Sequence, residues 1–160
     1  MQRQRGFSLI ELLIVVAILL ILAGLAIPNL VRARMAANEA SAVASLRVIN
    51  LAQRTYDITY TLGYADALTK LQPPPGLNQP PTVNNADLID KILATGSKSG
   101  YLITLTAGAP VSGRVVTYQT WGDPQSPRLT GITHYFSDES AVIRFNMVNQ
   151  AGPGDPPIPR

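Results

Sequence analysis

The sequence predicts an α+β fold in which one long N-terminal helix, residues 7–60, carries a small antiparallel β-meander head on its C-terminal half. Residues 12–27 are apolar throughout, and residues 29–60 contain neither glycine nor proline. After residue 100 the pattern alternates with a period of two, which is typical of strands. We therefore divide the chain into a leader and four further segments, which are residues 1–6, 7–28, 29–60, 61–148 and 149–160.

Residues 7–28 have the length of a membrane span, because about 20 apolar residues at 1.5 Å each cross a hydrocarbon layer of ~30 Å. A secretory signal peptide shares this outline, with small residues at 23–26 near a possible cleavage site. A simple membrane anchor shares it too. The apolar run is longer than the ~7–15 residues of a signal-peptide core, which favours a retained span.

Glu11 is the feature that a signal peptide or a plain anchor leaves unexplained. An acid at the centre of a span costs roughly 2.5–3.5 kcal/mol, and somewhat less near its end, so it indicates a functional role. The apolar run contains no lysine or arginine to pair with it. A cut between Gly6 and Phe7 would create an α-amine on Phe7, and this amine could meet Glu11 of its own chain or of an adjacent copy. The helix N-terminus also favours an acid in its first turn.

The basic leader with Arg3 and Arg5, the sequence Gly-Phe-Ser-Leu-Ile-Glu at residues 6–11, and the later Pro28 form a single pattern. This pattern resembles the N-terminal signature of type IV pilins and type II secretion pseudopilins. The resemblance is specific over residues 1–35. It implies a pilin-like fold and a structural subunit of a type IV pilus or pilus-like filament, rather than an enzyme. A pseudopilin and a membrane-anchored extracytoplasmic binding domain are the alternatives.

The resemblance also implies roles for three residues. A prepilin peptidase would cut between Gly6 and Phe7 and N-methylate Phe7. Glu11 would then neutralise the Phe7 amine of a neighbouring subunit as copies of the chain polymerise into a helical filament. The implied partners are other copies of the chain, the peptidase, an inner-membrane assembly platform, and membrane lipid before assembly.

Orientation follows from charge. Arg3 and Arg5 favour a single-pass inner-membrane topology with a cytoplasmic N-terminus, followed by a periplasmic or extracellular filament. Arg32 and Arg34 lie beyond the span and weaken this asymmetry. We expect them to act as interfacial anchors rather than to pair with Glu39 of a neighbour.

Gly24 and Pro28 are the predicted break in the helix, because glycine costs about 1 kcal/mol and an interior proline removes a backbone hydrogen bond. We expect a kink or local unwinding there. In the resembled family this region can loosen on entry into the filament. The second half of the helix is one-sided, and its apolar stripe consists of Ala42, Leu46, Ile49, Ala52, Tyr56 and Tyr60.

The head is predicted to begin with a proline-rich loop over 61–83, followed by a helix over 86–95 that Asn84 or Asn85 caps and Gly96 ends. Four strands follow, with a turn at 122–124. We expect a disordered tail over 149–160. The predicted strands are residues 101–106, 114–121, 130–137 and 141–147.

Composition and charge argue against several functions. There is no cysteine, so disulfides, thiol catalysis and cysteine-ligated metals are excluded. The net charge of +3 comes from residues 1–60, so we expect no nucleic-acid partner. We also expect no cofactor and no catalytic site.

Few residues of the head suggest chemistry. His134, the only histidine, lies in a strand pattern without a nucleophile motif. Asp123, Asp138 and Glu139 resemble the acidic loops that bind calcium in some pseudopilins. They lack a spaced ligand loop, so we interpret them as turn residues and expect no metal site. Trp121 is expected to serve in packing.

Overall fold

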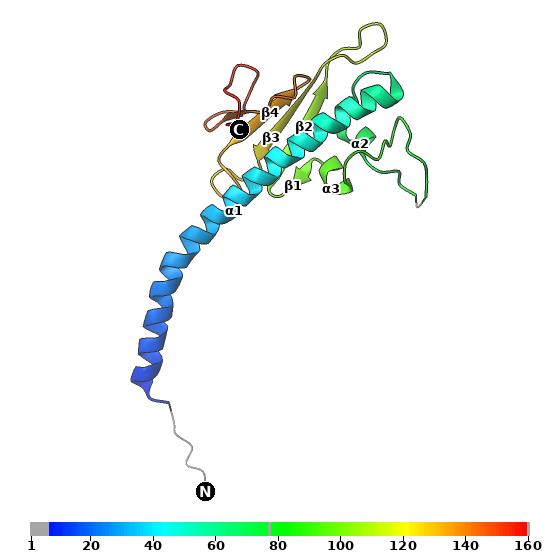
Figure 1. Ribbon diagram of the computed structural model, residues 1–160. Coiled ribbons are helices and arrows are strands. Elements are labelled where there is room, and N and C mark those ends of the chain that lie inside the picture. The colour runs from blue at the N-terminus through cyan, green and yellow to red at the C-terminus, as the bar shows by residue number, and fades with distance from the viewer. Residues whose placement is uncertain (1–6, 77, 160) are drawn as a thin grey trace. The chain divides into compact units, whose positions relative to one another are not determined.

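The computed structural model describes residues 7–76 and 78–159. The chain divides into two compact units between Arg34 and Met35. One helix, α1 (Leu9–Tyr60), contributes to both units, in agreement with the predicted long helix. The head adds two one-turn helices and five strands (Figure 1). These are α2 (Leu68–Leu71), α3 (Lys91–Ala94), β1 (Ser97–Lys98), β2 (Tyr101–Ala107), β3 (Tyr118–Pro124), β4 (His134–Asp138) and β5 (Arg144–Asn146).

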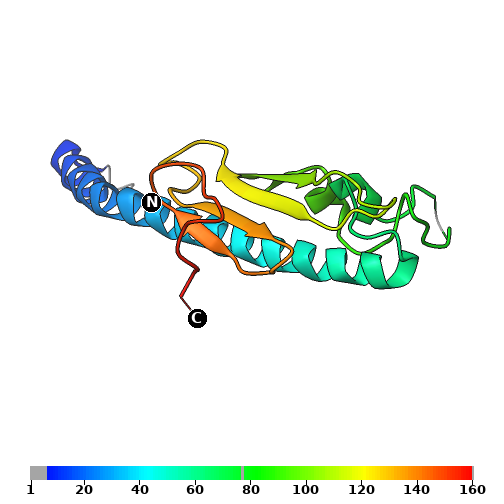
Figure 2. The same cartoon turned by 90° about the horizontal axis from the view of Figure 1, so that it is seen from above.

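The five strands form one sheet in the order β1-β2-β3-β4-β5, with every neighbouring pair antiparallel. The predicted α+β class and the meander are therefore confirmed. Within the head, the sheet lies along one side of α1 (Figure 2). The predicted apolar stripe forms the contact, because Ala42, Leu46, Ile49, Ala52 and Tyr56 are buried and Tyr60 is half-buried.

The buried face of α1 also contains amides that the stripe did not predict. Asn50, expected off the stripe, accepts a hydrogen bond from Tyr118 Oη at 3.0 Å and donates to Ser137 Oγ at 2.8 Å. Gln53 donates to the carbonyl of Ala65 at 2.9 Å and accepts from its N–H at 2.7 Å. These bonds fix the register between helix, loop and sheet, since any slip would leave a buried polar group unpaired.

Replacing Gln53 with alanine should lower the free energy of unfolding by about 1–3 kcal/mol, because both backbone groups of Ala65 lose their partner in the core. Chemical denaturation of the full chain in detergent would measure the change. Thr59→Ala, an exposed position on the same helix, is the control and should change stability little. Equal stability of both variants would contradict the role assigned to Gln53.

Burial of tyrosines predicts sensitivity to alkali. Desolvation raises the pKa of Tyr101, Tyr118 and Tyr135 above the ordinary value of 10.0. The unfolded chain releases these protons at lower pH than the folded chain does. Their stabilising contribution is therefore complete below about pH 10 and falls as pH rises beyond it. Free energies of unfolding measured at rising pH should show this decline, and Tyr118→Phe should reduce its slope. An unchanged slope would contradict the prediction.

Three local predictions for the region before the sheet were wrong. The helix predicted over 86–95 is only α3, because residues 86–89 bond to the backbone of residues 70–72 instead. The capping residue is Asp90, whose Oδ1 accepts from Leu93 N at 2.8 Å, and not Asn84 or Asn85. Gly96 ends the helix as predicted, with φ +76°. The segment 61–83, which was predicted to be a loop, contains the one-turn helix α2.

The strand boundaries also differ from the prediction. Residues 122–124, predicted as a turn, belong to β3 and pair with residues 101–103 of β2. The predicted start at Arg114 instead lies in the β2–β3 connection, where Arg114 pairs with Asp57 at 2.7 Å. Strand β1 was not predicted.

The expectation of a disordered tail is wrong for residues 151–158. Ile158 N donates to the carbonyl of Ile143 at 2.9 Å, and the Ile158 side chain packs on the core. Asp155 closes the loop after β5. Its carboxylate accepts from Asn146 Nδ2 at 3.0 Å and from Gly152 N at 2.7 Å, and its carbonyl accepts from Arg144 at 2.8 Å.

Candidate functional site

The first turn of α1 holds Glu11 in place. The backbone N–H of Ser8, immediately before the helix, donates to Oε2 of Glu11 at 3.0 Å, and Leu12 N donates to the Ser8 carbonyl at 3.2 Å. Ser-x-x-Glu is the spacing of a capping box, in which an acid in the first turn satisfies the N–H of the capping residue. The helix dipole favours the same placement.

The capping role of Glu11 was missed in the sequence, although Ser-x-x-Glu before an apolar run is its signal. Phe7 adjoins Ser8 and is exposed, so an α-amine on Phe7 would lie one residue from the N–H that Glu11 already accepts. Oε1 of Glu11 has no hydrogen bond to any residue that the structure describes. Gly6, the other predicted processing residue, lies outside the described residues.

The apolar half of α1 is exposed along its length. Every large apolar side chain from Phe7 to Leu30 is at least 45% exposed. Among the described residues, α1 is the one helix long and apolar enough to cross a membrane. Such a surface requires lipid or other protein chains around it.

The helix continues through Gly24 and Pro28 without local unwinding in the single chain, and the alternative of a kink at this position stays a prediction. Pro28 has no N–H to donate to the carbonyl of Gly24, and Asn29 adds a side-chain bond to the Leu25 carbonyl at 3.2 Å. Loosening of this turn during assembly stays a prediction.

The polar residues singled out in the head form local pairs rather than one cluster. His134 Nδ1 lies 2.6 Å from Asp123 Oδ1, and Asp123 Oδ2 accepts from Gln150 at 2.9 Å. Asp138 accepts from Ser140 N at 3.0 Å. Within residues 7–76 and 78–159, no group of three histidine, aspartate or glutamate side chains lies close enough together to hold a metal ion. The Trp121 indole donates to the Ala151 carbonyl at 3.1 Å and packs on Phe136 with ring centroids 5.7 Å apart.

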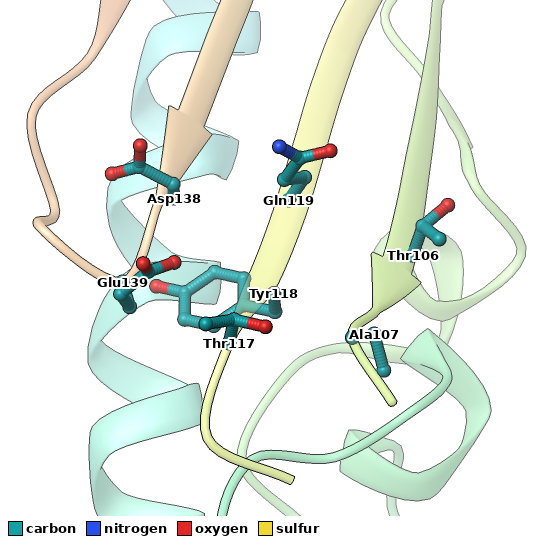
Figure 3. Close-up of a pocket in the computed structure, with 8 residues that line it drawn as sticks. Thr106, Ala107, Thr117, Tyr118, Gln119, Asp138 and Glu139 are labelled. Carbon is teal, nitrogen blue, oxygen red and sulfur yellow. The ribbon is translucent and has the colours of Figure 1, made fainter. Parts of the chain in front are cut away.

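One polar hollow of about 320 Å³ opens where β2, β3 and β4 meet the connections beyond them (Figure 3). Asp138, Glu139 and Gln119 line it together with threonine hydroxyls. The Tyr118 ring forms part of its wall, but the hydroxyl is already bonded to Asn50. The lining of the hollow is more polar than apolar, and none of its described side chains has a buried atom without a hydrogen bond.

Comparisons with known proteins agree with the N-terminal pattern. Residues 1–27 match the family model described as the prokaryotic N-terminal methylation motif. The chain is 38% identical over 114 residues to the type IV wide pilus major component PilA4 of Thermus thermophilus, an alignment covering 69% of this chain and 80% of that protein.

The chain belongs to the type IV pilin family.

This pilin is also 44% identical over 54 residues to the type IV major pilin protein PilA of Myxococcus xanthus, which covers 34% of the chain and 24% of that protein. It therefore spans about a quarter of the length of that relative. No solved structure matches the pilin.

Proposed function

We propose that this pilin is a structural subunit of a type IV pilus, cleaved between Gly6 and Phe7, N-methylated on Phe7, and polymerised through its N-terminal helix. The methylation motif over residues 1–27 and the exposed apolar half of α1 carry the proposal. Both matched relatives are named as major pilus components, which favours a pilus over a secretion pseudopilin or an anchored binding domain.

Glu11 and Phe7 form the proposed assembly contact. Glu11 Oε2 stays on the Ser8 N–H of its own chain, and Oε1 receives the Phe7 amine of a neighbour. A charge pair in a surrounding without water is far stronger than in solution, and either partner alone is costly there. The contact joins two different surfaces, and heterologous contacts that do not close into a ring generate open helical filaments.

The outward face of α1 in the head supports the same arrangement. Val48, Leu51 and Ile58 point away from the head and are between 43% and 78% exposed. Arg47 and Arg54 lie beside them and form no salt bridge with the residues that the structure describes. Two copies of this face would bring arginines together, so the apolar half of another copy, which has no lysine or arginine, is the better partner.

Before assembly, the apolar half of α1 spans the inner membrane with its N-terminus in the cytoplasm, where a prepilin peptidase acts on it. An assembly platform then moves the subunit into the filament. Arg32 and Arg34 serve as anchors at the membrane interface. The alternative, in which these arginines pair with Glu39 of a neighbour, is less favoured. Oε1 of Glu39 already accepts a hydrogen bond from Ile132 N of its own chain at 2.9 Å.

Intact mass and N-terminal sequencing of the mature protein test the processing step. The expected chain starts at Phe7 and carries one added methyl group. A chain that retains Met1 would indicate a simple anchor, and a start near Ile27 would indicate a cleaved signal peptide. Either result would overturn the proposed function.

A further inference from the structure

Four exposed aliphatic side chains gather at one end of the head's sheet. Leu129, Ile132, Met147 and Val148 are between 44% and 82% exposed. His134 begins β4 and pairs with Asn146, which ends β5, so the residues just before β4 and just after β5 lie at the same end of the sheet. Arg128, next to Leu129, is exposed and forms no salt bridge within the described part of the chain. We name residues 128–132 and 147–148 the apolar foot.

The foot is bonded to the beginning of the head's part of α1. Asn38 Nδ2 donates to the Thr130 carbonyl at 2.8 Å, and Glu39 Oε1 accepts from Ile132 N at 2.9 Å and from Thr133 N at 3.2 Å. Only residues 28–37 separate Ile27 from Asn38. Even a fully extended chain of this length reaches at most about 40 Å. The chain length therefore limits how far Asn38, which the foot contacts, can lie from any membrane that the apolar half spans.

The aliphatic side chains of the foot have little freedom to withdraw into the core. Tyr101 Oη donates to the Thr133 carbonyl at 2.9 Å and occupies the space under Gly131, where a side chain would collide with the tyrosine ring. Two N–H groups are fixed by Glu39. The loop is held against the sheet with its apolar side chains outward, which is unfavourable in water unless another surface covers them.

We propose that the foot rests on the membrane surface in subunits that have not yet assembled. Leu129, Ile132, Met147 and Val148 enter the boundary between headgroups and acyl chains, and Arg128 contacts anionic headgroups. We favour lipid as the partner for two reasons. The link through residues 28–37 holds the foot at a high effective concentration relative to the membrane that α1 spans. An arginine beside aliphatic side chains is also typical of segments that bind the membrane interface. The proposal concerns the head and rests only on insertion of α1, not on filament assembly.

Single cysteine variants of this cysteine-free chain test the proposal. Leu129→Cys and Val148→Cys carry an environment-sensitive fluorophore, with the full chain in vesicles of phosphatidylcholine and phosphatidylglycerol. Val111→Cys is the matched control, because Val111 is 59% exposed in the β2–β3 connection at the opposite end of the sheet (Figure 1). Leu19→Cys reports insertion of α1 separately.

Labels at 129 and 148 should be blue-shifted and quenched by lipids spin-labelled near the headgroup, whereas the label at 111 should report water. Equal, water-like signals at all three positions, with the label at 19 inserted, would overturn the proposal. A blue shift at 129 and 148 that appears only as the ratio of protein to lipid rises would indicate that a second copy of the chain covers the foot. This result would also overturn the proposal. Arg128→Glu should weaken quenching at 148 in vesicles that contain phosphatidylglycerol, and an unchanged signal would overturn the headgroup contact.

Discussion

Replacing Glu11 with glutamine is expected to give a pilin that enters the membrane and is cleaved and methylated, yet yields at least tenfold fewer filaments. Glutamine keeps an oxygen for the Ser8 N–H, so the first turn of α1 is retained. It removes the charge proposed to neutralise the Phe7 amine of the next subunit. An unpaired charge buried in an interface typically costs about 3–5 kcal/mol, and every subunit in the filament would bear this cost.

Filaments sheared from cells, compared with the membrane pool by immunoblotting, would measure the loss. Glu139→Gln is the matched control, since it also removes one exposed acid but lies in the head. It should leave the filament yield unchanged. Abundant normal filaments from the Glu11 variant would refute the charge pair, whereas loss of processing in that variant would place its defect at the peptidase instead.

The second large effect is expected from Gly6→Val, which should leave unprocessed precursor in the membrane. A β-branched side chain next to the cut bond restricts the backbone and adds bulk where the motif has no side chain. Gly6→Ala should slow maturation only mildly. Because the uncut chain never forms the Phe7 amine, the valine variant should also fail to assemble.

Mass spectrometry of the membrane fraction distinguishes the failed processing expected for Gly6→Val from the failed assembly expected for the Glu11 variant. The valine variant should retain its leader, and the Glu11 variant should not. Normal maturation of the valine variant would contradict the assignment of Gly6 and Phe7 as the processing site.

Regular patterns in the sequence predicted the large elements, and unusual local pairings account for the errors. The helix predicted over 7–60 is α1, and the meander follows from short connections between alternating segments. Strand β3 was misplaced because Gly122 and Pro124 suggest a turn, although their backbone pairs with β2. Asn50 was left off the predicted stripe, because a polar side chain gives no sign of the two buried hydrogen bonds that only the folded sheet supplies.

The candidate site was more readable than the head, because its chemistry is local in sequence. The conflict between Glu11 and its apolar surroundings is visible without a structure, whereas its bond to Ser8 requires attention to helix capping. The unbroken helix across Pro28 shows that one missing backbone bond is tolerated in a long helix. The apolar foot was not predicted, since its two loops meet only where β4 and β5 pair and where Asn38 of α1 binds Thr130.

The loop closed by Asp155 has a consequence for where and when the head can fold. Asp155 accepts three hydrogen bonds, two on its carboxylate and one on its backbone carbonyl, and so fastens the segment after β5 in a chain without cysteine. Folding of the head then needs no oxidant and no thiol-exchange catalyst. Reducing agents should therefore leave the folded head intact, which unfolding measurements with and without a reductant would check.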